Sequence, residues 1–196
     1  KRTAAARRNH HARRGGLVEH VAQMMRCAVA VCGVYPVLNR DLMIAGVLFH
    51  DCGKLWENAH AENSFAQPYN LMAEMLGHIP LGLEVVNKLW RELMERPEAA
   101  EWLHLEPASD AVRLHLLHLI AAHHGSLEFG SPVLPKTPEA VALHHVDNID
   151  AKLEMFRKAY ESGKELAPGI IEKFAPWPVN IVAPLPMVPP PPPPVA

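Results

Sequence analysis

The sequence has 196 residues, enough for one domain with a sizeable core and an additional segment. Hydrophobic residues make up 49% of it and charged residues 20%, a balance that excludes a wholly disordered or collagen-like chain. Histidine is abundant, with 13 residues against only 3 cysteines. Any metal site in this chain must therefore be built from imidazole and carboxylate ligands rather than thiolates.

Positive charge is concentrated at the start of the chain. The first 14 residues contain six lysine and arginine residues and no acidic residue, so the rest of the chain holds 13 basic and 21 acidic side chains. Residues 1–14 are therefore predicted to form a basic N-terminal arm. Two interpretations of this arm are open, because it either contacts the phosphates of a nucleic acid or is a solvated start to the first helix.

Helical periodicity of apolar residues runs through most of the chain. The segments with this spacing are 17–32, 40–49, 68–77, 79–95, 110–124 and 138–162. We expect Asn39 to cap the second segment, Thr137 to cap the last, and Gly33 to end the first in a left-handed conformation. No alternating strand of useful length is found, so the sequence predicts an all-α domain over residues 15–165.

The C-terminal segment has a different composition. Residues 175–196 hold ten of the 19 prolines, six of them consecutive, which predicts a proline-rich extended tail. Such a tail either binds an aromatic groove of a partner domain or is a stiff extension. The sequence shows neither an uncharged apolar run of about 18 residues nor a secretory signal, and its cysteines lack paired spacing. We expect a cytoplasmic protein with free thiols and no membrane contact.

Polar residues beside apolar segments point to the chemistry. They are His20, the pair His50-Asp51 with Lys54 after it, the pair His123-His124, and Asp147. A single buried histidine is usually a hydrogen-bonded core residue. A cation bound by several of these groups would offset the free-energy cost of burying all of them, so the set as a whole favours a metal centre.

The order of these residues resembles a known family. His20, His50-Asp51 and Asp147 are similar to the H…HD…D signature of HD-domain metal-dependent phosphohydrolases, which have an all-helical fold with a buried metal centre. His78 in GHIPLG and His123-His124 in IAAHHG resemble the additional histidines of the subset that binds two metal ions. The stretches NHHARRGGLVEH at 9–20 and HHGSLEFGSPVLPKTPEAVALHHVDNIDAKLEMF at 123–156 look like the HD domain of YhaM-type 3′→5′ exoribonucleases. The oligonucleotide-binding fold that precedes the HD domain in that family is not part of this sequence.

The resemblance implies a ligand set. One ion would be held by His20, His50, Asp51 and Asp147, while Asp51 would bridge to a second ion completed by His78 and His123. We expect Mn²⁺, with Fe, Zn²⁺ or Mg²⁺ as alternatives. Two ions that share a carboxylate lie about 3.5–4 Å apart, close enough to bind both the attacking and the leaving oxygen of a phosphodiester. They also lower the pKa of water, so no side-chain base is required.

Further roles follow from the resemblance and from residue chemistry. Asp51 and Lys54 are the candidate catalytic residues, Lys54 by neutralising the scissile phosphate. Adjacent helical residues point about 100° apart, so we expect His123 to be the ligand and His124 either to contact substrate or to support the ligands from behind. In the loop 125–138, Phe129 is a candidate to stack on a base and Lys136 to contact a phosphate.

The resemblance implies a metal-dependent phosphodiesterase that degrades single-stranded RNA, or DNA, from the 3′ end and releases nucleoside 5′-monophosphates. One alternative is a hydrolase of small nucleotides or cyclic dinucleotides, although the GYP-type motif of the latter enzymes is missing. Another alternative is a regulatory nucleotide-binding domain without turnover.

Overall fold

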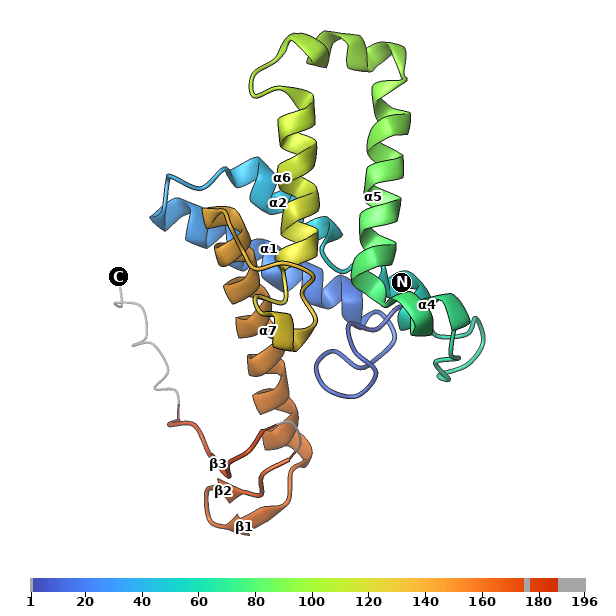
Figure 1. Ribbon diagram of the computed structural model, residues 1–196. Coiled ribbons are helices and arrows are strands. Elements are labelled where there is room, and N and C mark those ends of the chain that lie inside the picture. The colour runs from blue at the N-terminus through green and yellow to red at the C-terminus, as the bar shows by residue number, and fades with distance from the viewer. Residues whose placement is uncertain (1, 175–176, 187–196) are drawn as a thin grey trace, which may run out of the picture. The chain divides into compact units, whose positions relative to one another are not determined.

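A computed structural model describes residues 2–174 and 177–186, and most of them are helical (Figure 1). The helices are α1 (Gly16–Val34), α2 (Arg40–Phe49), α3 (Lys54–Glu57), α4 (Leu71–Leu76), α5 (His78–Met94), α6 (Ser109–Ala122) and α7 (Pro138–Ser162). Two 3-10 helices, η1 (Pro97–His104) and η2 (Leu127–Phe129), lie before and after α6. The chain divides into two compact units, of which the first ends at Lys152 and the second begins at Leu153. The predicted all-α class is confirmed for the first unit.

Helix ends follow the local chemistry in most places. The Asn39 side chain accepts a hydrogen bond from the backbone N–H of Leu42, and the Thr137 hydroxyl accepts one from Ala140, so both predicted caps are confirmed. Gly77 has a φ of 74° and separates α4 from α5. The prediction for Gly33 is wrong, because α1 includes it with a negative φ and continues to Val34.

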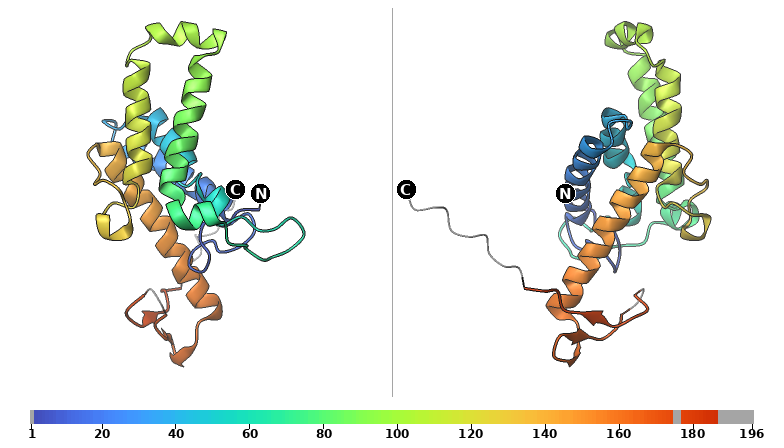
Figure 2. Two further views of the ribbon diagram at one scale, coloured as in Figure 1. Left: turned by 45° about the vertical axis from the view of Figure 1, so that its right-hand side comes forward. Right: turned by 90° about the vertical axis from the view of Figure 1, so that its left-hand side faces the viewer.

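The core of the first unit lies among α1, α2, α5, α6 and the start of α7. Its fully buried side chains include Met24, Met43, Leu119 and Leu143. Figures 1 and 2 show α5 and α6 running side by side, with η1 joining their far ends. Each Leu→Ala change in such a core typically costs about 2–5 kcal/mol, so this packing holds the ends of α2, α5 and α6 in place.

The N-terminal segment packs against the turn region after α3. Thr3 forms an isolated antiparallel bridge with Ala59, and Ala4 and Ala5 are fully buried. The Arg7 guanidinium donates to the carbonyls of Glu57 and Gln67. Arg14 donates in the same way to carbonyls of residues 61, 62 and 64. These arginines therefore fix backbone loops, while contact between the predicted arm and phosphates stays a prediction.

The second unit contains a small antiparallel sheet that the sequence did not predict. Its strands β1 (Glu165–Ala167), β2 (Ile170–Ile171) and β3 (Ile181–Val182) pair in the order β1-β2-β3. Ile171 and Ile181 pack with Ala159 of α7 in a separate small core. Strands of two or three residues are too short to produce a readable alternation, which explains the omission.

The predicted proline-rich tail is described only over residues 177–186, where it includes β3. Its six consecutive prolines, for which we expected polyproline II geometry, lie outside the described residues.

Among the described helices, α1 is the one that is long and apolar enough to cross a membrane. Glu19 and Arg26 lie within this helix, so it is not an uncharged apolar run of the kind that the sequence lacks. The same helix carries His20, Met24 and Ala28, which are all fully buried inside the first unit.

Candidate metal centre and active site

The polar residues singled out in the sequence meet inside the first unit. His20 comes from α1, His50 and Asp51 from the end of α2, His78 from the start of α5, and Asp147 from α7. His123 and His124 follow the last residue of α6. His20, His50, Asp51 and His123 are at most 2% exposed. Five helix segments far apart in the sequence thus bring their polar residues into one buried cluster.

One part of the cluster is formed by His20, His50 and Asp51, whose nearest ligand atoms lie within 4.8 Å of one another. The Nε2 atoms of His20 and His50 lie 3.8 and 3.3 Å from Asp51 Oδ2. Asp147 Oδ1 lies 3.2 Å from His20 Nε2. We refer to these four residues as the first ligand group, which corresponds to the set that the resemblance implied for one ion.

The other part is formed by His78, His123 and His124, which we call the second ligand group. Asp51 Oδ1 lies 3.5 Å from His78 Nε2 and 3.6 Å from His123 Nε2. The structure thus places one oxygen of Asp51 beside each group. His124, for which the sequence suggests a role beside the ligands, has its Nε2 3.2 Å from His78 Nε2 and therefore faces the same space.

All five histidines of the two groups donate a hydrogen bond to another part of the protein through Nδ1. Nδ1 of His50, His123 and His124 donates to the backbone carbonyls of Val47, Ile120 and Phe129, at 2.9, 2.7 and 2.6 Å. Nδ1 of His20 and His78 donates to the carboxylates of Asp150 and Glu57, at 2.6 and 2.8 Å. These contacts leave each Nε2 atom directed into the cluster, where it can act as a ligand.

The donor set fits a divalent metal. His50 Nε2 and Asp51 Oδ1 are buried without a hydrogen-bond partner, although buried polar atoms are normally paired. The Nε2 atoms of His78 and His124 present lone pairs to each other across 3.2 Å. A bound cation would give the unpaired atoms a partner and would relieve the repulsion between the two lone pairs. Imidazole and carboxylate groups are common ligands of Mn²⁺, Fe and Zn²⁺.

Charge in the cluster stabilises ionised carboxylates. Burial alone would raise the pKa of Asp51, but the Lys54 ammonium and His50 hold that pKa well below its usual range. Burial is likewise outweighed at His20, where Asp147 and Asp150 raise the pKa to about 9. Burial and the neighbouring His123 lower the pKa of His124 to about 4. The anionic carboxylates and the neutral His124 ring match what a metal site requires, whereas His20 must release its Nε2 proton when a cation binds.

Two glycines lie so close to neighbouring residues that a larger side chain would not fit beside the cluster. A Cβ on Gly53 would lie 1.9 Å from the backbone carbonyl oxygen of His78, so only glycine lets the turn after Asp51 pack against the start of α5. Gly125 has a φ of 79°, and a Cβ there would lie within 2.5 Å of the His144 ring. Gly53, which lies between Asp51 and Lys54 in the sequence HDCGK at 50–54, therefore has a steric role in bringing His78 to Asp51.

A cavity of about 400 Å³ opens beside the two ligand groups. Its lining consists of Asn9, His10, Lys54, His124, Phe129, His144, Asp147, Asn148 and Ala151. Lys54 is 8% exposed, and its ammonium lies 2.7 Å from Asp51 Oδ2. Phe129 is 67% exposed at the rim, in η2. The predicted substrate residues His124 and Phe129 thus face this cavity.

Lys136, the third predicted substrate residue, is exposed and is not among the residues that line the cavity. Its backbone N–H donates to the His118 ring. The cavity instead contains Asn9, His144 and Asn148, which sequence reasoning did not select. His144 donates to the His123 carbonyl, a contact that its position three residues before Asp147 does not reveal.

Asp150 and Glu57 are the residues next to the cluster that sequence reasoning missed. Asp150 follows Asp147 by three residues on α7, so helical periodicity placed it on the same face. Glu57 follows Lys54 by three residues in α3, which gives the same type of signal.

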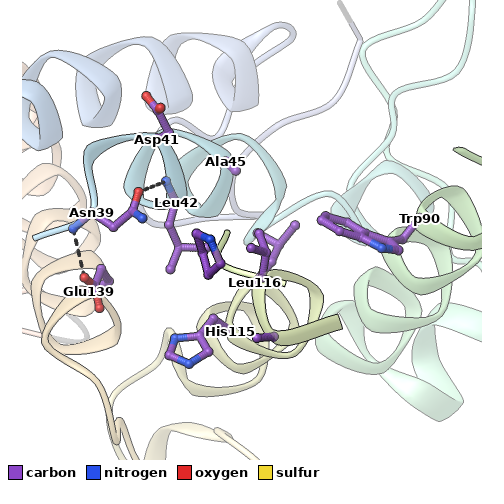
Figure 3. Close-up of a pocket in the computed structure, with 11 residues that line it drawn as sticks. Asn39, Asp41, Leu42, Ala45, Trp90, His115, Leu116 and Glu139 are labelled. Carbon is purple, nitrogen blue, oxygen red and sulfur yellow. Dashed lines mark hydrogen bonds between the residues drawn. The ribbon is translucent and has the colours of Figure 1, made fainter. Parts of the chain in front are cut away.

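A second cavity, of about 480 Å³, lies elsewhere in the first unit (Figure 3). Leu42 and Ala45 of α2, Trp90 of α5 and Leu116 of α6 give it mainly apolar walls. Figure 3 also shows Glu139, which accepts a hydrogen bond from the backbone N–H of Asn39. None of the residues in the two ligand groups lines this cavity, so the chemistry belongs to the first cavity.

Comparisons with known proteins agree with this geometry. The family model of the HD domain matches residues 17–152. The 3′-5′ exoribonucleases YhaM of Geobacillus sp. (strain WCH70) and Bacillus subtilis (strain 168) are 39% and 40% identical to this chain over 160 residues. These matches cover 82% of the chain but only 44% and 46% of the relatives, so the chain spans about half the length of the curated relatives it matches. No solved structure matches the chain significantly.

Proposed function

This chain belongs to the HD-domain family of metal-dependent phosphohydrolases, and we propose that it hydrolyses single-stranded RNA from the 3′ end to nucleoside 5′-monophosphates. Single-stranded DNA is the second substrate that the same chemistry accepts. The choice of RNA and of the 3′→5′ direction rests on the relatives, which are named 3′-5′ exoribonucleases. We also infer a cytoplasmic location, in keeping with three free cysteines.

The position of Asp51 between the two ligand groups is the observation that supports this proposal most directly. One carboxylate oxygen lies near His20 and His50, and the other lies near His78 and His123. In the proposal the first ligand group holds one ion, and His78 and His123 hold a second ion that shares Asp51. Mn²⁺ is the preferred metal.

Two such ions would polarise the phosphoryl oxygens of a bound phosphodiester and lower the pKa of water. The side chains of the cavity perform the remaining tasks. Burial opposes the charge on Lys54, but Asp51 and Asp147 raise its pKa, so its ammonium stays charged. In the proposal this ammonium contacts the scissile phosphate and stabilises the negative charge that develops there.

The cavity has suitable size and side chains for one terminal nucleotide. Phe129 offers an exposed aromatic face at the rim, on which a base can stack without sequence preference. Asn9 and Asn148 offer amide groups that can bind a base edge or a ribose hydroxyl. His124 faces both His78 and this cavity, so in our proposal it contacts substrate next to the second ion.

The test is a panel of substrates incubated with the purified chain and Mn²⁺. We expect 5′-labelled single-stranded RNA to shorten stepwise and to release nucleoside 5′-monophosphates, as resolved by gel electrophoresis and chromatography. Hydrolysis of cyclic dinucleotides or nucleoside phosphates without RNA shortening would support the small-nucleotide alternative. Nucleotide binding with no product from any substrate would support the regulatory alternative.

Two controls make the panel decisive. RNA with a blocked 3′ end distinguishes an exonuclease, which it stops, from an endonuclease, which still cleaves internally. Asp51→Ala, prepared in parallel, reports any contaminating nuclease. Equal product from the wild type and Asp51→Ala would overturn the proposal.

A further inference from the structure

The five histidines of the two ligand groups differ in what holds their Nδ1 atoms. Neutral backbone carbonyls accept from three of them, whereas carboxylates accept from His20 and His78. Each ligand group contains one histidine whose Nδ1 donates to a carboxylate, His20 in the first group and His78 in the second. Their partners, Asp150 and Glu57, belong to neither group. Asp150 does lie within 4.8 Å of ligand atoms of His11 and His20, but its Oδ2 accepts hydrogen bonds from both rings, so we treat it as a support for His20 rather than as a ligand.

We propose that Asp150 and Glu57 are positioning residues, one for each metal ion, and that each sets the metal affinity of its own ligand group. This inference rests on the two-ion arrangement proposed above. Asp150 acts on the first ion through His20, and Glu57 acts on the second ion through His78. Neither residue contacts an ion or the substrate.

A carboxylate does more to a ligand histidine than a carbonyl does. It fixes the tautomer and the ring orientation, and its negative charge makes Nε2 a stronger electron donor. Residues in this position typically change metal affinity by about 10–100-fold when they are substituted. The carboxylates beside His20 and His78 are close enough for this effect, at 2.6 and 2.8 Å.

The second ligand group depends more on its supporting carboxylate. The first group contains Asp147 and one oxygen of Asp51. The second group contains three imidazoles, and Asp51 Oδ1 supplies the negative charge beside the Nε2 atoms of His78 and His123. Glu57 thus adds negative charge where the ligands supply less of it, so its removal should weaken binding more than removal of the Asp150 charge.

Two residues of the N-terminal segment form hydrogen bonds with Asp150 and Glu57. His11 is fully buried and its Nε2 lies 2.9 Å from Asp150 Oδ2, the same oxygen that accepts from His20. Arg7 donates to the backbone carbonyl of Glu57 at 2.8 Å. His11 therefore helps to fix the Asp150 carboxylate, and Arg7 anchors the backbone of Glu57. This arrangement assigns part of the predicted basic arm to construction of the metal centre.

The experiment is a calorimetric titration of the metal-depleted full chain with Mn²⁺ alone, for the wild type, Asp150→Asn and Glu57→Gln. Both changes are nearly isosteric and remove one charge. We expect two binding steps in the wild type. Each variant should lose about 10–100-fold in the affinity of one step, a different step in each, with the larger loss in Glu57→Gln.

Matched controls are Asp41→Asn and Glu62→Gln, whose carboxylates are 93% and 83% exposed. Both controls should keep the wild-type titration. Circular dichroism establishes that each variant is folded. If Asp150→Asn does not fold, His11→Gln tests the same support, because it leaves Asp150 charged and should weaken the same step to a smaller extent.

The possible results separate this inference from the proposed function. Two binding steps with unchanged affinities in both variants, or an equal loss in both steps of either variant, would overturn the positioning roles. A single Mn²⁺ per wild-type chain would overturn the assignment of one residue to each ion. Selective losses without any RNA hydrolysis by the wild type would support the positioning roles while rejecting the exoribonuclease proposal.

Discussion

His115 of α6 and His123, the residue directly after α6, lie about two helical turns apart in very different surroundings. His115 is exposed and borders the apolar cavity of Figure 3. His123 is 1% exposed, donates through Nδ1 to Ile120, and directs Nε2 toward Asp51. The difference teaches that burial and a neighbouring carboxylate distinguish the candidate ligand His123 from the exposed His115. The following substitutions test that contrast, from the largest expected effect to the smallest.

Asp51→Ala should have the largest effect, because it removes the carboxylate that lies beside both ligand groups. We expect Mn²⁺ binding to be lost and RNA hydrolysis to fall by about 10³-fold or more. Metal content by mass spectrometry and initial rates of RNA shortening measure the two losses. Activity retained with Mn²⁺ would reject the shared-ligand role of Asp51.

His123→Gln and His115→Gln compare the two positions on α6 directly. We expect His123→Gln to reduce hydrolysis by about 100-fold and to weaken one Mn²⁺ step, since it removes a ligand of the second group. His115→Gln should leave both quantities at the wild-type level. Equal effects of the two substitutions would contradict the contrast drawn from their burial.

Lys54→Met separates phosphate stabilisation from metal binding. We expect kcat to fall by about 10²-fold, because the ammonium beside Asp51 is removed from the cavity. Mn²⁺ affinity should not fall, since the change removes a positive charge next to a metal ligand. Steady-state kinetics with parallel calorimetry measure both, and loss of bound metal would assign Lys54 a structural role instead.

Phe129→Ala should have a smaller effect that appears in substrate binding. Loss of a stacking surface costs about 1–3 kcal/mol per base, so KM for single-stranded RNA should rise by about 10-fold with kcat nearly unchanged. The neighbouring Leu127→Ala, also on the exposed surface of η2, is a suitable control. Identical KM values for the two variants would exclude base stacking on Phe129.

Much of the fold could be predicted because its signals are local. Asn39 and Thr137 cap helices through hydrogen bonds to residues three positions away, so the sequence contains both partners. The strands β1 to β3 lack such a signal, because they depend on pairing between short segments. Gly33 carried a misleading signal, since glycine allows a left-handed end to a helix but does not require one.

The sequence by itself determined which residue types the centre contains, because His50-Asp51, His123 and Asp147 stand in a recognisable order beside apolar helices. Only the tertiary structure decided which ring nitrogen each histidine leaves free. His20 and Asp150 are 130 residues apart, and His78 and Glu57 come from different helices, so packing alone makes them partners. Spacing cannot reveal these contacts, because hydrogen-bond geometry requires atoms to meet within about 3 Å.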